Sequence, residues 1–141
     1  MKKLELTLYG NPDVDIREGE QGDTDDDTKD KKRLPFVARK IAVLKIKYGQ
    51  EKYCLHNESP FYYDGATIPF GLCKGDTRLL TPALFHDLMC NDKSKIGYNR
   101  FLSSLIYYKL LRMFKVNWLW AFTQFVIVDT FQRFCKGWKG R

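Results

Sequence analysis

The periodicity of the apolar residues changes between the two halves of the chain, and this change constrains the fold most. From Leu4 to Tyr9 apolar residues alternate with polar ones, which is the pattern of a strand with one buried face. From residue 81 onward they recur three and four residues apart, on one face of a helix. The order predicts an α+β fold, with a small antiparallel sheet followed by a three-helix C-terminal half.

The first half contains a second strand signal that predicts a hairpin. A mostly alternating, β-branched run extends from residue 36 to 48, and Gly49-Gln50 separates it from a shorter run at 52–55. Residues 61–64 follow a strand-breaking segment and are expected to enter a glycine-containing loop in an extended conformation. This loop therefore leaves a small antiparallel sheet.

The first expected helix has the clearest start signal. Thr81 is a good N-cap residue, and Pro82 then occupies the first helical position, where its missing N–H costs nothing. His86 and Asp87 fall in the second turn. His86 and Cys90, four residues apart, share one face of the helix.

Two further helices complete the second half. One is expected from residue 98 or 99 to 114, and the other from just after Asn117, a good cap, to near Cys135. The apolar residues expected to face inward on the former are Phe101, Leu102, Leu105, Ile106, Leu110 and Met113. Residues 118–128 are apolar almost all round but shorter than the roughly 20 residues that span a bilayer. A buried core helix is expected, and a membrane-surface anchor stays open.

Charge is segregated along a chain whose 141 residues fit a single domain, 1–141. Nine of the 17 acidic residues lie between residues 11 and 30, and the surrounding residues 11–33 are predicted to form a flexible acidic loop. The rest of the chain holds 22 basic and 8 acidic residues, a net charge of +14. An anionic partner is expected, either a membrane surface or an acidic protein, with nucleic acid as a further alternative.

Targeting and redox signals are few. The N-terminal residues include two lysines but no apolar signal-peptide core, so export by that route is not expected. The four cysteines are therefore expected to be reduced. Their spacing with the two histidines is irregular and gives little support to a zinc site, for which buried free thiols are a simpler explanation.

Two segments contain the residue types of a hydrolytic site. Asp64 and Gly65 stand in the loop after the strands, and His86-Asp87 stands on the first helix. Two carboxylates with loop carbonyls provide the hard oxygen ligands that calcium prefers, and a neutral His accepts a proton from water near neutral pH. The pattern predicts metal-assisted hydrolysis, while His86 and Asp87 taken alone fit a structural role as well.

Residues 60–138 resemble a phage- and prophage-encoded family, the domain-of-unknown-function family 1353. The resemblance is carried by Asp64–Pro69, by Ala83–Asp87, by Tyr98–Leu102 and by the closing segment Phe131–Trp138. It implies a phage protein, located in the host cytoplasm or in the virion. It does not imply a particular reaction.

The same order of motifs more distantly resembles the microbial phospholipases A2. That resemblance implies that His86 is the base for a water molecule, that Asp64, Asp87 and the Gly65 carbonyl bind calcium, and that Asn99 stands where those enzymes have an aspartate. An amide accepts a hydrogen bond from the His but supplies no charge to stabilise the imidazolium. Two classes of function stay open: a calcium-dependent, phospholipase A2-like lipid-ester hydrolase, and a non-catalytic virion or phage accessory protein.

Overall fold

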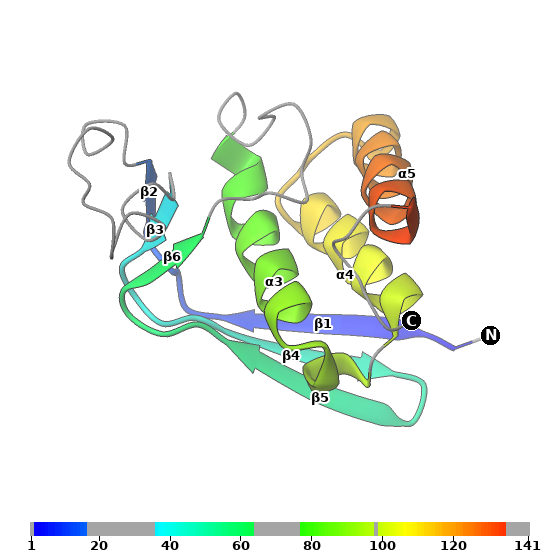
Figure 1. Cartoon of the computed structure of the whole chain (residues 1–141), viewed down its shortest axis with the longest axis horizontal. Coiled ribbons are helices and arrows are strands. Elements are labelled where there is room, and N and C mark those ends of the chain that lie inside the picture. The colour runs from blue at the N-terminus through cyan, green and yellow to red at the C-terminus, as the bar shows by residue number, and fades with distance from the viewer. Residues whose placement is uncertain (1, 17–35, 64–76, 98, 135–141) are drawn as a thin grey trace.

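The computed structural model describes residues 2–16, 36–63, 77–97 and 99–134 (Figure 1). The strands all lie in the N-terminal half and form two antiparallel sheets of three strands each. Three α-helices follow in the C-terminal half. The predicted α+β class, with its three-helix second half, is confirmed.

The larger sheet has the strand order β1-β4-β5. Its strands are β1 (Leu4–Tyr9), β4 (Val43–Tyr48) and β5 (Glu51–His56). Alternation along β4 buries Leu44 and Ile46 and exposes Lys45 and Lys47, which leaves one apolar face for the helices. The predicted first strand and the predicted hairpin are confirmed. Gly49 has a positive φ of 64° in the turn between β4 and β5.

The smaller sheet has the order β2-β3-β6 and lies beyond one end of the larger sheet (Figure 1). Its strands are β2 (Val14–Ile16), β3 (Phe36–Ala38) and β6 (Phe61–Tyr63). Strand β2 corrects the predicted loop over residues 11–33, of which residues 17–33 lie outside the described part. The run from 36 to 48 is likewise two strands in different sheets, because β3 pairs with β2 and β6 while β4 pairs with β1 and β5.

Asn57 joins the segments that connect the two sheets. Its side chain is fully buried and makes three hydrogen bonds. The Oδ1 atom accepts from the Ala42 N–H at 2.9 Å, and Nδ2 donates to the carbonyls of Lys40 and Glu58 at 2.9 and 2.8 Å. These bonds satisfy backbone groups of two crossing segments where no ladder partner is present. They hold the segment between β3 and β4 against the segment between β5 and β6.

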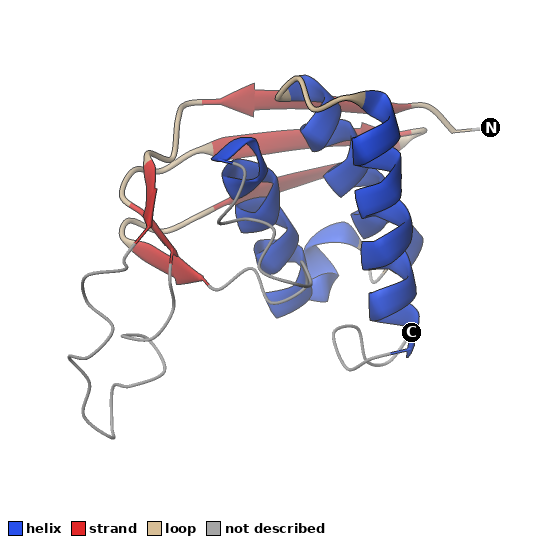
Figure 2. Ribbon diagram, turned by 90° about the horizontal axis from the view of Figure 1, so that it is seen from above, coloured by secondary structure: helices blue, strands red, loops and turns tan. Residues whose placement is uncertain are grey.

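The helices cover one face of the larger sheet (Figure 2). They are α3 (Leu80–Asn91), α4 (Arg100–Met113) and α5 (Trp118–Phe134). The short 3-10 helices η3 (Thr77–Leu79) and η4 (Lys93–Ile96) flank α3. Helix α3 contacts β5, α4 contacts β1, and α5 packs on α4, so the apolar core lies between the sheet and the helix pair α3 and α4.

The second and third helices agree with their predicted ranges to within two residues. Helix α5 begins directly after Asn117, whose side chain accepts a hydrogen bond from the Leu119 N–H at 2.8 Å. The predicted inward face of α4 is wrong at Phe101 and Met113, which are 46% and 41% exposed. In the part of the chain described, no helix is both long enough and apolar enough to cross a bilayer.

Candidate functional site

Helix α3 carries both His86 and Asp87 and is almost entirely buried through its first two turns. It starts at Leu80 as a continuation of the 3-10 turn η3, and no side chain caps it. The predicted cap at Thr81 is therefore wrong, because the backbone at Leu79 is already helical. Thr81 is buried within the first turn.

The His86 ring is fully buried and held from two sides. Its Nδ1 atom lies 3.8 Å from the Sγ atom of Cys90, one turn further along α3. Its ring also packs on the Tyr107 ring of α4, with the centroids 5.4 Å apart. The predicted shared face of His86 and Cys90 is confirmed. These contacts restrict the rotation of the imidazole and place Nδ1 beside a weak hydrogen-bonding group.

Cys90 and the exposed Cys54 are both reduced thiols. The protonation of the imidazole depends on which partner of the Cys90 contact donates. If Nδ1–H donates to sulfur, Nε2 has the free lone pair of a base; if the thiol donates, Nε2 carries the proton. Cys90 is thus a positioning residue that the sequence pattern placed near His86 without indicating this effect.

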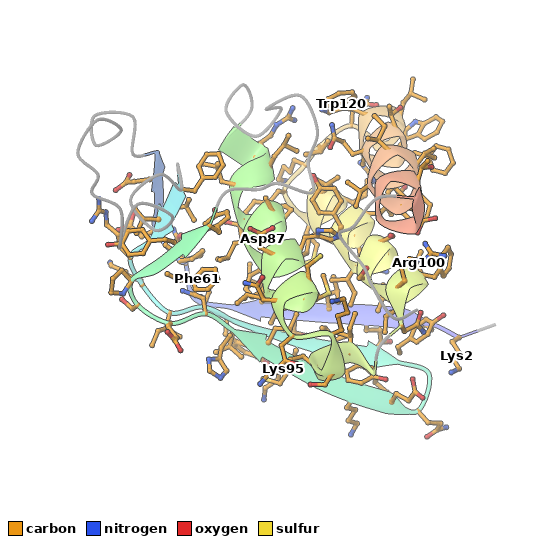
Figure 3. The ribbon with its side chains drawn as sticks, viewed as in Figure 1. Lys2, Phe61, Asp87, Lys95, Arg100 and Trp120 are labelled. Carbon is orange, nitrogen blue, oxygen red and sulfur yellow. The ribbon has the colours of Figure 1, made fainter. Side chains whose placement is uncertain are left out.

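Asp87 projects from the middle of α3 (Figure 3) and is 9% exposed. Successive helix residues point about 100° apart, so its carboxylate and the His86 ring leave the helix in different directions. Among the described residues no group of three His, Cys, Asp or Glu side chains gathers as a metal site. Asp64 and Gly65, the other expected calcium ligands, lie outside the described residues.

The residue before Asp64 is tied directly to the helix that carries His86. The Tyr63 hydroxyl, at the end of β6, donates a hydrogen bond of 2.8 Å to the Leu80 carbonyl in the first turn of α3. Both residues are buried. The hydrogen bond therefore ties the last residue of β6 to the first turn of α3.

Asn99 is the N-cap of α4. Its Oδ1 atom accepts a hydrogen bond from the Leu102 N–H at 3.0 Å, and its backbone is extended, as at other N-caps. The amide oxygen that was expected to accept from the imidazole is thus already used by the helix. The side-chain nitrogen, Nδ2, can only donate.

A polar layer between α4 and α5 was not predicted from the sequence. Asp129 of α5 pairs with Arg100 and accepts a hydrogen bond from the Ser104 hydroxyl at 2.9 Å. Tyr107, which touches His86, donates to the Gln124 Oε1 atom at 3.3 Å. These polar residues belong to two separate helices. The sequence pattern of either helix alone does not indicate that they contact one another.

Gln124 ends this chain of contacts with an unsatisfied donor. Its side chain is fully buried, and its Nε2 atom has no hydrogen-bond partner among the residues that the structure describes. The contacts run from Cys90 through His86 and Tyr107 to Gln124. A buried polar chain of this kind fixes side-chain positions strongly, because each broken contact leaves a polar group inside the core.

Comparison with known proteins adds no family to this description. No family model, no curated protein and no solved structure matches the chain.

Proposed function

We propose that this is a phage-type protein whose His86-Asp87 site carries out calcium-assisted ester hydrolysis. The observation that supports it best is the immobilised imidazole of His86, which is held by Cys90 and Tyr107 and belongs to the same helix as the nearly buried carboxylate of Asp87. A base that is already oriented loses little freedom when it meets its substrate. Such a pair is the minimum needed to combine proton transfer with cation binding.

In this proposal the chain's own residues move one proton. His86 accepts it from a water molecule whose oxygen attacks the ester carbonyl carbon. As the bond to the alcohol oxygen breaks, the imidazolium returns the proton to the leaving alkoxide. Tyr107 keeps the ring plane fixed through both steps. Asn99 supplies no charge to the imidazolium, so a slow reaction is expected from this arrangement.

The oxygen ligands that Asp64, Gly65 and Asp87 would provide are of the type that calcium prefers. Carboxylate and backbone carbonyl oxygens are its usual ligands, and Asp87 supplies a nearly buried carboxylate. Asp64 and the Gly65 carbonyl would complete the set, and the hydrogen bond between Tyr63 and Leu80 supports their approach to α3. Bound calcium would polarise the ester carbonyl and stabilise the negative charge that develops on it.

The complete burial of His86 favours a second function. In a non-catalytic virion or phage accessory protein, the contacts of His86 with Cys90 and Tyr107 act as a structural network. The basic excess of the chain then serves to bind an anionic viral partner, membrane or nucleic acid. No turnover is expected in this case.

Calcium titration by calorimetry tests the first proposal without a choice of substrate. Saturable binding to the wild-type protein is expected, with a loss of affinity of about tenfold or more in Asp87→Asn. Asp92→Asn is the matched control, because Asp92 is an exposed carboxylate just after the end of α3. Equal binding by wild type and Asp87→Asn would exclude Asp87 as a ligand.

A panel of fluorogenic fatty-acid esters then tests the base. Turnover by the wild type and its loss in a folded His86→Asn variant are expected. Absence of both calcium binding and turnover in folded wild-type protein would favour the accessory function instead. Turnover that persists in folded His86→Asn would refute the assignment of the base.

A further inference from the structure

Helices α4 and α5 expose an unusually apolar surface, which we call the aromatic face. Trp118 and Leu119 are each 59% exposed, and Phe122 is 49% exposed. Phe101 and Val126 are also exposed, and Leu105, Tyr108 and Phe125 are partly buried between them. Contiguous apolar surface of this kind on a soluble domain usually marks a binding site for a membrane or a protein.

The aromatic face is built around one ring. Phe125 contacts Phe101, Tyr108 and Phe122, with ring centroids 6.0, 6.1 and 6.0 Å apart. A groove of about 220 Å³ runs between the two helices and is lined by Leu105, Tyr108, Phe122 and Phe125. The rings hold one another in place, so this surface is formed before any partner binds.

Positive charge borders one end of the aromatic face. Lys109, Arg112 and Lys115 are exposed near the junction of α4 and α5, and none of them forms an ion pair with another described residue. Arg112 is held at this junction by donating to the Val116 carbonyl at 2.8 Å. The one acidic residue of the two helices, Asp129, is 16% exposed and paired with Arg100. The border therefore keeps its positive charge.

This combination selects an anionic lipid surface as the partner. Tryptophan and aromatic side chains favour the boundary between headgroups and acyl chains, and neighbouring cations attract anionic headgroups. A second copy of the chain fits less well, because the one acidic side chain of α4 and α5, Asp129, is already paired with Arg100 and does not neutralise the positive border of a partner copy. Since no described helix can span a bilayer, the contact is with the surface.

We propose that the aromatic face docks the protein on membranes that contain anionic phospholipid, with α5 lying along the interface. Trp118, Leu119 and Phe122 enter the boundary region, while Arg112 and Lys115 meet lipid phosphates. Docking requires no catalysis at His86, so it stands or falls separately from ester hydrolysis. If both hold, docking also explains access to an aggregated lipid ester.

The other basic surface of the protein provides a control. Lys45, Lys47 and Lys52 surround a depression of about 410 Å³ on the outer face of the larger sheet. The helices cover the opposite face of this sheet (Figure 2). This surface offers charge without a comparable aromatic cluster. Simple electrostatic adsorption would use it as readily as the aromatic face.

Vesicle co-sedimentation with the full chain tests the proposal. We expect strong binding to vesicles of phosphatidylcholine that contain about 30% phosphatidylglycerol, an anionic lipid. Binding to vesicles of pure phosphatidylcholine is expected to be weak. Leu119→Ser/Phe122→Ser is expected to lower the affinity by about tenfold or more, and Lys45→Glu/Lys47→Glu by about twofold or less. Both pairs are at exposed positions, and circular dichroism checks that each variant is folded.

Each other outcome overturns the proposal. Failure of the wild-type protein to bind either type of vesicle would exclude membrane docking. Loss of binding in Lys45→Glu/Lys47→Glu with retention in Leu119→Ser/Phe122→Ser would assign the contact to the sheet. Sedimentation velocity decides the remaining case: a wild-type dimer that Leu119→Ser/Phe122→Ser converts to a monomer, without lipid binding, would make the aromatic face a self-association surface.

Discussion

The buried hydroxyl of Tyr63 donates a hydrogen bond of 2.8 Å to the carbonyl of Leu80, and this bond joins the last strand to the helix that carries His86. It connects the smaller sheet to α3 across a segment of the chain that includes Asp64 and Gly65. The end of β6 is therefore fixed relative to the first turn of α3.

Removal of this bond should lower stability without a change of fold. Tyr63→Phe is expected to reduce the free energy of unfolding by about 1 kcal/mol, the usual net value of a neutral hydrogen bond. Urea denaturation measures the change. Tyr9→Phe is the control, because Tyr9 is 53% exposed, and its effect should stay within about 0.5 kcal/mol. Equal effects of the two variants would show that the bond contributes nothing.

Asn99 offers a test that separates capping from catalysis. Asn99→Ala should lower the free energy of unfolding by about 1 kcal/mol, because the Leu102 N–H loses its acceptor. Asn99→Asp should keep the cap and gain a favourable interaction with the helix dipole. Thermal unfolding compares the two.

The same Asp substitution also reports on the proposed hydrolysis. If His86 is a base and residue 99 orients it, ester turnover should rise in Asn99→Asp, since a carboxylate stabilises the imidazolium. Unchanged turnover would confine Asn99 to its role as a cap. Asn117→Asp is a useful comparison, since Asn117 caps α5 in the same way through the Leu119 N–H.

The Arg100–Asp129 pair should contribute more than the ion pairs at the surface. Its side chains are 20% and 16% exposed, and Asp129 also accepts from Ser104. Asp129→Asn is expected to cost about 1–3 kcal/mol, because Arg100 is left partly buried without its counter-charge. Glu5→Gln breaks the exposed pair with Lys3 and should cost less than about 1 kcal/mol. Similar costs for the two would contradict a structural role for the polar layer.

Asp92 should titrate below its ordinary range. The pKa of its carboxyl is lowered from the ordinary value, mainly by the hydrogen bond from the Ser94 hydroxyl. Desolvation opposes this shift, and the Ser94 backbone N–H and the charge of Lys95 add to it by smaller amounts. Because the pKa of Asp92 is lower in the folded than in the unfolded protein, its ionised carboxylate stabilises the fold at pH values above the pKa of the unfolded state. This contribution is lost as the pH falls through the pKa of the folded state. Carbon-13 NMR of the carboxyl in wild type and Ser94→Ala measures it. A pKa that does not rise in Ser94→Ala would show that the hydroxyl is not the main cause.

Local signals predicted most of the elements. The alternation of residues 4–9 predicted β1, Gly49 predicted the hairpin turn, and Asn117 predicted the start of α5. Each depends on residues that are close in sequence, so one segment is sufficient to recognise it. The N-cap predicted at Thr81 was wrong because this prediction, too, used only residues close in sequence. A good capping residue was present, but the preceding turn η3 had already formed the helix end, and Thr81 became part of the buried first turn.

The residues of the candidate site also fall into those that local sequence predicted and those that it did not. His86, Asp87 and Cys90 are neighbours on one helix, so their spacing was sufficient to associate them. Tyr107 was missed as the partner of the His86 ring because it comes from α4, and helical spacing says nothing about which residue of a second helix it meets.

The sequence by itself determined the α+β class, the type of most strands and helices, and the placement of His86 and Asp87 on one helix, since all of these follow from local patterns along the chain. Tertiary packing alone decided that β3 and β4 belong to different sheets, that Phe101 faces outward, and that His86 is enclosed by Tyr107. Alternation and helical spacing specify which face of an element is apolar. The face that becomes buried depends on which other element covers it, and that contact joins residues far apart in the sequence.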